Sequence, residues 1–73
     1  MATVTNDSQI EQIGSTAGEV WQVLSANGPM SMARLVATVG QPRTAVLLAL
    51  GWLAREDKVS IDEEGRTRVV SLR

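Results

Sequence analysis

The chain offers few groups for acid–base or metal chemistry. Its 73 residues include no Cys, His or Tyr, which removes thiolate and imidazole chemistry together with the zinc sites built on sulfur or imidazole. Asp62, Glu63 and Glu64 are adjacent acids that could in principle bind a hard cation. Because adjacent acids on a turn point in different directions, we expect a solvated hairpin tip there. The sequence therefore predicts no enzyme, no metal site and no cofactor.

Basic and amide side chains could instead contact nucleic acid. Gln41 could recognise adenine, Arg43 could recognise guanine, and Thr44 could hold a phosphate. The other candidate phosphate contacts are cations scattered along the chain, namely Arg34, Lys58, Arg66 and Arg68. However, the formal net charge is −1 and the sequence pI is about 5.2, whereas a nucleic-acid-binding domain typically has a pI above about 9. Binding to DNA would therefore need a locally basic face.

A third possibility is an apolar interface. Leu48 and Trp52 are four residues apart, which places them on one helical face with Ala45 and Ala49 beside them. Exposed apolar patches mark interfaces, and Trp is enriched at their energetic centres. The alternative is that the first helix and the hairpin cover Trp52.

A homodimer is the expected assembly. A domain of this size buries only about 60% of the surface that its unfolded chain exposes, and the sequence offers neither a disulfide nor a metal as compensation. The predicted contacts are Leu48 and Trp52, with Ile10 and Ile13 as a second candidate.

Helical periodicity predicts the first element, from Gln9 to Ala26. Its apolar residues lie on a single core-facing stripe that comprises Ile10, Ile13, Ala17, Val20, Trp21 and Leu24. Gly14 and Gly18 weaken this helix. The sequence Asn27-Gly28-Pro29 then ends it, with Gly placed for a left-handed cap and Pro just beyond.

Two further helices follow a very short extended segment at Pro29 and Met30. Ser31 is a good N-cap for a helix that ends at Val39, before Gly40. This helix should direct Met32, Leu35, Val36 and Val39 inward and Arg34 and Thr38 outward. Pro42 is well placed to begin a third helix, which extends to Glu56. Its predicted core face comprises Val46, Leu47, Leu50, Leu53 and Ala54.

After Glu56 the apolar period changes from 3.6 to 2, which predicts a β-hairpin over Lys58–Leu72. We expect a turn at residues 62–65 with Gly65 as a left-handed bulge residue. That turn would pair Asp62 with Arg66 and Val59 with Val69. Asp62 would then partly neutralise Arg66, and Glu63 and Glu64 at the tip would repel phosphate.

The order of helix, minimal strand, helix, turn, helix and hairpin is that of a small α+β winged helix-turn-helix domain. We expect this domain to cover residues 9–73, with residues 1–8 as a disordered N-terminal tail. No apolar run approaches the roughly 18 residues that a membrane span needs, and a cytoplasmic protein with no membrane contact is the expectation.

Two stretches also resemble a known family. They are NGPMS at residues 27–31, followed by Leu35, and LGWLAREDKV at residues 50–59. Both are similar to a family of small bacterial and archaeal winged helix-turn-helix proteins catalogued as a domain of unknown function. The resemblance extends from about Ile10 to Val70 and implies the fold, but the family offers no established site residues. By analogy with the fold, we expect a DNA-associated regulatory protein that binds double-stranded DNA. The alternative is a winged helix that binds another protein and no nucleic acid.

Overall fold

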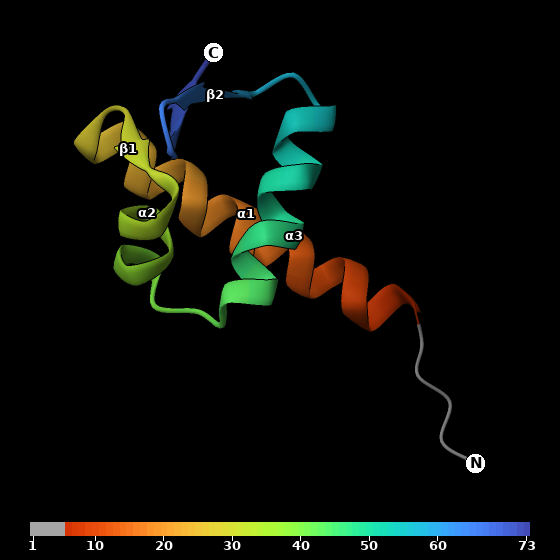
Figure 1. Ribbon diagram of the computed structural model, residues 1–73. Helices are drawn as coiled ribbons and strands as arrows, with labels where there is room; N and C mark the ends of the chain where they lie inside the picture. Colours follow the sequence, from red (N-terminus) through yellow and green to blue (C-terminus); the bar gives the residue numbers. More distant parts are fainter. Residues whose placement is uncertain (1–5) are drawn as a thin grey trace.

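Figure 1 shows the computed structural model, which describes the backbone of residues 6–73 and the side chains of residues 8–73. Three helices and a three-stranded sheet confirm the predicted α+β winged helix. The elements are α1 (Asn6–Asn27), β1 (Met30–Ser31), α2 (Met32–Val39), α3 (Arg43–Arg55), β2 (Val59–Glu64) and β3 (Thr67–Leu72). None of the helices in this part of the chain is long and apolar enough to cross a bilayer.

Helix α1 crosses behind the other two helices, and its N-terminal turns extend beyond them (Figure 1). It begins at Asn6, three residues before the predicted start, and residues 1–5 of the predicted tail lie outside the described residues. It ends as predicted, because Gly28 adopts a left-handed φ of 77° and its N–H donates to the Leu24 carbonyl at 2.8 Å.

The turn between α2 and α3 closely follows the sequence prediction. Ser31 caps α2, with its Oγ accepting a hydrogen bond from the Arg34 N–H at 3.2 Å. Gly40 ends α2 in a left-handed conformation, and its N–H donates to the Val36 carbonyl. Pro42 is the N-cap residue of α3 and precedes its first helical residue, Arg43. Gly40 and Pro42 therefore set where α2 ends and α3 begins.

The sheet has the strand order β1-β3-β2, and we call its antiparallel β2–β3 hairpin the wing. The predicted register was wrong by three residues, because Val59 pairs with Leu72 and Asp62 pairs with Val69. The strands continue to Glu64 and resume at Thr67, which leaves a two-residue loop. Gly65 occupies its first position with φ 64°, where hairpin turns of the type II′ class favour Gly.

This register decides which wing residues enter the core. Val70 pairs with Ile61 on one side and with Met30 on the other, and its side chain is fully buried. Val69, which the predicted register paired with the buried Val59, instead pairs with Asp62 and is only partly buried. The remaining buried apolar residues are Ala17, Val20, Leu24, Met30, Leu35, Val46, Ala49, Leu50, Leu53 and Val59.

Four predicted core residues of the helices are exposed instead. Ile10 and Trp21 of α1 are 50% and 45% exposed, and Leu47 and Ala54 of α3 are also exposed. Ala49, which we expected beside an exposed patch, is instead completely buried. The face of α3 that packs against α1 is therefore rotated toward Ala49, where a small side chain allows the two helices to approach closely.

Candidate functional site

A cleft lies between the start of α3, the first turn of α2 and the tip of the wing. Arg43 is the first residue of α3, Arg66 lies in the wing loop and Arg68 lies on β3. All three line one cleft of about 290 Å³, together with Ser31, Met32, Ala33 and Thr67. We call it the basic cleft. It brings together three of the predicted nucleic-acid-binding residues that are distant in the sequence.

Two helix N-termini adjoin the basic cleft and favour an anion there. Ser31, Met32 and Ala33 belong to the cap and first turn of α2. The start of α3 has no side-chain cap, and neither helix has an acidic residue in its first turn. N–H groups and the positive end of the helix dipole stabilise anions at such positions. Sequence reasoning did not foresee the contribution of α2 to this cleft, although the N-cap at Ser31 was a usable signal.

The acidic residues of the wing are divided between its two faces. Glu63 pairs with Arg68 across the hairpin, and its Oε2 lies 4.0 Å from the Arg68 Nε. Both side chains are exposed, so this ion pair contributes little. Because side chains alternate along a strand, Asp62 and Glu64 lie on the other face. The expected neutralisation of Arg66 by Asp62 was wrong, since Asp62 pairs with Val69.

The other predicted nucleic-acid contacts are not part of the basic cleft. The Nε2 of Gln41 donates to the Glu19 carboxylate at 3.3 Å, on the side of α3 that faces α1. Arg34 lines a separate hollow beside Pro29, and Lys58 lies at the base of the wing. Thr44 is exposed in the first turn of α3, next to Arg43.

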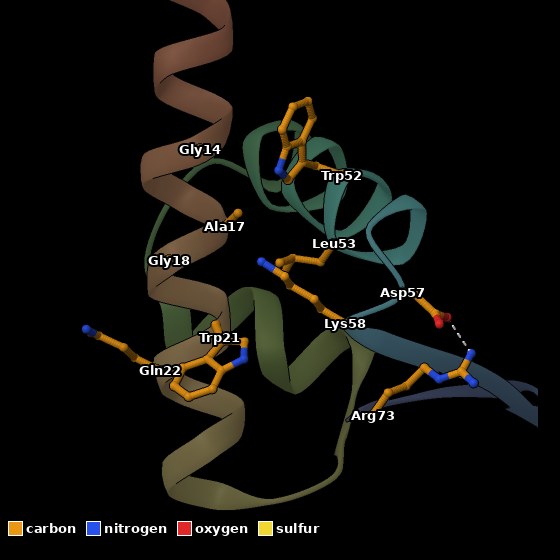
Figure 2. A pocket seen from close by; sticks show the side chains of 10 residues that line it. All are labelled: Gly14, Ala17, Gly18, Trp21, Gln22, Trp52, Leu53, Asp57, Lys58 and Arg73. Carbon is orange, nitrogen blue, oxygen red and sulfur yellow. Dashed lines mark ion pairs between the residues drawn. The ribbon is translucent and has the colours of Figure 1, made fainter.

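A second and larger hollow separates α1 from α3 (Figure 2). We call it the apolar groove. It has a volume of about 690 Å³ and is lined by Gly14, Ala17, Gly18, Trp21, Gln22, Trp52, Leu53, Asp57, Lys58 and Arg73. Trp52 stands above the groove and Trp21 lies below it, while Lys58 extends alongside Leu53 toward α1 (Figure 2). The side of the groove that α1 forms presents few side-chain atoms, because Gly14 and Gly18 have no side chains.

The predicted interface residues lie in or next to this groove. Trp52 is 46% exposed, so α1 and the hairpin cover only part of it, and Leu48 is 50% exposed one turn earlier on α3. Ile10 is exposed one turn before Gly14, whereas Ile13 is partly buried. We missed Trp21 as an interface candidate because its spacing is in phase with the core stripe of α1.

The groove is closed at one end by the link between α3 and the end of the wing. Arg73 Nη1 lies 2.7 Å from Oδ1 of Asp57, and the Arg73 N–H donates to the Lys58 carbonyl at 3.0 Å. Among the described residues, no group of three or more acidic side chains is arranged to hold a metal ion.

Comparison with known proteins agrees with this architecture. A family model described as a winged helix-turn-helix domain (DUF2582) matches residues 7–72. An uncharacterized protein of Methanocaldococcus jannaschii, MJ1608, is 32% identical over 65 residues, which cover 85% of this chain and 91% of that protein. The solution NMR structure of protein BT2368 from Bacteroides thetaiotaomicron superimposes with a TM-score of 0.77. It is 32% identical in sequence, and the match covers 85% of this chain and 76% of that one.

Proposed function

Because the chain belongs to the winged helix-turn-helix domain family DUF2582, we propose that it is a DNA-associated regulatory protein that binds the phosphate backbone of double-stranded DNA in its basic cleft. The observation that carries this proposal is that Arg43, Arg66 and Arg68 line a single cleft. In this architecture the start of the third helix enters the major groove while the wing contacts phosphates.

The charge within the cleft supports DNA binding better than the charge of the whole chain does. The net charge of −1 includes the acids of α1, none of which lines the cleft. In the wing, Glu64 pairs with Thr67 of the cleft lining and offsets part of its positive charge. Glu63 is the acid paired with Arg68, and their 4.0 Å separation leaves the guanidinium able to turn toward a phosphate. The first turns of α2 and α3 add N–H donors to the same anion site.

The exposed face of α3 favours backbone contact over base recognition. Leu48 lies near the centre of that face and Gln41 is held by Glu19. Arg43 and Thr44 are the remaining polar groups at its N-terminal end. We therefore expect weak binding to many DNA sequences, with any sequence preference due to Arg43.

The salt dependence of DNA binding tests this proposal. Log affinity should fall with log salt with a slope of about 2.7, since three neutralised phosphates contribute about 0.9 each. The variant Arg66→Gln/Arg68→Gln should reduce the slope by about 1.8 and leave sequence preference largely intact. Arg43→Gln should weaken binding by roughly 1–3 kcal/mol if Arg43 contacts a base. Fluorescence anisotropy with a labelled duplex measures both quantities.

Arg55→Gln is the matched control, because it removes one positive charge at the other end of α3, about 18 Å along the helix. It should leave the slope within about 0.5 of the unmodified value. If Arg55→Gln and the wing variant have equal effects, diffuse attraction explains the binding and the cleft has no special role.

A second candidate function is favoured by the apolar groove. Trp21 and Trp52 are each about half exposed and lie beside the surface of α1 at Gly14 and Gly18. Exposed aromatic side chains of this kind are typical of a protein-binding surface. If the unmodified protein binds no duplex even at low salt, this protein-interaction function replaces the first proposal.

A further inference from the structure

The apolar groove has the properties of one half of a twofold interface. We propose that two copies of the chain associate through it, with α1 of each copy packed antiparallel against α1 of the other. The groove shares no lining residue with the basic cleft, although Leu48 at its margin also lies on the face of α3 that would meet DNA.

The two glycines of α1 have no role in a single copy that would explain them. Apart from the neighbouring atoms of α1 itself, no heavy atom lies within 4 Å of the position that a Cβ would take at Gly14 or Gly18. Both residues are exposed, and glycine in the middle of a helix lowers its stability. A second helix packed on this surface provides a reason, because two helices lacking side chains at the contact can approach more closely.

The spacing of residues on α1 is self-complementary about a twofold axis. If the axis passes between Ser15 and Thr16, Ile10 of one copy lies opposite Trp21 of the other. The same axis places Gly14 opposite Ala17, which is buried, and Gly18 opposite Ile13, which is partly buried, so each glycine of one copy meets a side chain that projects little from the other. A symmetric interface requires this reciprocity, in which each residue pair occurs twice.

The area of the exposed patch also suits a second copy. Ile10, Trp21, Leu48 and Trp52 are each about half exposed, so they offer roughly 400 Å² of apolar surface per copy. Twofold pairing covers this patch on both copies, about 800 Å² in all, and homodimer interfaces are roughly 65% apolar. The total then reaches about 1,200 Å², the lower limit of specific interfaces.

Charge does not oppose this contact. Asp57 and Arg73 compensate each other at the end of the groove, which leaves Lys58 as its remaining charge. Helix α1 carries three acidic residues, Asp7, Glu11 and Glu19, and no basic residue, so a second α1 brings acidic charge toward a basic rim. The two Glu11 residues would be separated by nine residues, about 14 Å along the helices, which exceeds the screening length of about 8 Å at physiological salt. Glu19 of one copy lies one residue along the helix from Glu11 of the other, but its carboxylate accepts from Gln41 in a separate hollow that shares no residue with the groove.

The test adds a side chain to the floor of the groove and measures mass. Sedimentation equilibrium of the unmodified protein at micromolar concentration should give twice the chain mass of 7.8 kDa. Gly14→Gln and Gly18→Gln should each raise the dimer dissociation constant at least tenfold. Gly51→Gln is the matched control, because Gly51 is also an exposed helical glycine with open space around it, on α3 outside the groove. It should leave the dissociation constant within about twofold.

Tryptophan fluorescence gives a second measurement that does not depend on mass. Trp21 and Trp52 are the two tryptophans of the chain, and both line the groove. Their emission should shift to shorter wavelength as the protein is concentrated, and Gly18→Gln should abolish the shift while circular dichroism shows no loss of helix. A monomer at several hundred micromolar would overturn the proposal. A dimer that withstands both groove variants would overturn it equally, since the interface would then lie elsewhere.

Discussion

Asp57 and Arg73 join the end of α3 to the end of the wing, with 2.7 Å between Oδ1 and Nη1. Asp57 also has a left-handed φ of 63°, at the position after a helix where Gly is usual. Its N–H donates to the Ala54 carbonyl, and the Lys58 N–H donates to the Leu53 carbonyl. These two hydrogen bonds form a Schellman motif, so one acidic residue both ends the helix and binds the last arginine.

Substitution of Asp57 separates these two roles. We expect Asp57→Ala to lower the free energy of unfolding by about 1 kcal/mol, because Ala is strained in the left-handed region. Asp57→Gly removes that strain and should not lower it. Arg73→Ala removes only an ion pair between exposed groups and should change it by less than about 0.5 kcal/mol. Urea titration measures all three, and equal losses for Asp57→Ala and Arg73→Ala would show that the ion pair dominates.

Two glycine substitutions should change stability in opposite directions. Gly65→Ala should lower the free energy of unfolding by about 1 kcal/mol, since Gly65 has φ 64° in the wing loop. Gly51→Ala should raise it by up to about 1 kcal/mol, because Gly51 is an exposed residue within α3. Thermal unfolding measures both. A stabilising Gly65→Ala would contradict the two-residue turn and the register derived from it.

The core should depend on Leu35 far more than on Leu48. Leu35 is fully buried in α2, and Leu48 is 50% exposed on α3. Leu35→Ala should cost about 2–5 kcal/mol, a large part of the stability of so small a domain. Leu48→Ala should cost less than about 1 kcal/mol when measured at a concentration that keeps the chain monomeric. Similar losses for both would mean that Leu48 packs into the core.

The sequence predicted the fold well because its local signals are independent of long-range packing. The N-cap at Ser31, the left-handed glycines at positions 28 and 40, and the change to alternating periodicity after Glu56 each define an element by themselves. The predicted wing register was wrong because Gly65 fits either the last position of a three-residue loop or the first position of a two-residue loop. Tertiary contact decides between them, since Val70 must pair with both Met30 and Ile61 in the core.

The candidate sites were less predictable than the fold. The sequence identified Arg43, Arg66 and Arg68 as candidate nucleic-acid contacts, but it did not show that they share a site. They line one cleft because the wing packs beside α2 and the start of α3. The predicted core stripe of α1 spans an arc of about 100° at helical pitch, and Trp21 lies at one edge of it. Ala17 of this stripe is buried, whereas Trp21 is 45% exposed. Helical periodicity identifies which face of a helix is buried. It does not show whether a residue at the edge of that face, such as Trp21, belongs to the core or to an interface.

Leu48→Lys distinguishes the two candidate functions most directly. Leu48 is exposed on the face of α3 between Thr44 and Trp52, so a lysine there adds a cation to the surface that would meet DNA. If the basic cleft binds duplex, we expect tighter binding at low salt and a salt slope steeper by about 0.9. The control Leu48→Gln removes the same apolar surface without adding charge, and it should leave the slope unchanged.

Because Leu48 lies at the margin of the apolar groove, Leu48→Lys and Leu48→Gln should both weaken the dimer less than Gly18→Gln does. Anisotropy measures DNA binding and sedimentation measures dimerisation, on the same samples. If Leu48→Lys and Leu48→Gln both dissociate the dimer, and the unmodified protein binds no duplex at low salt, the protein-interaction function is the one that remains.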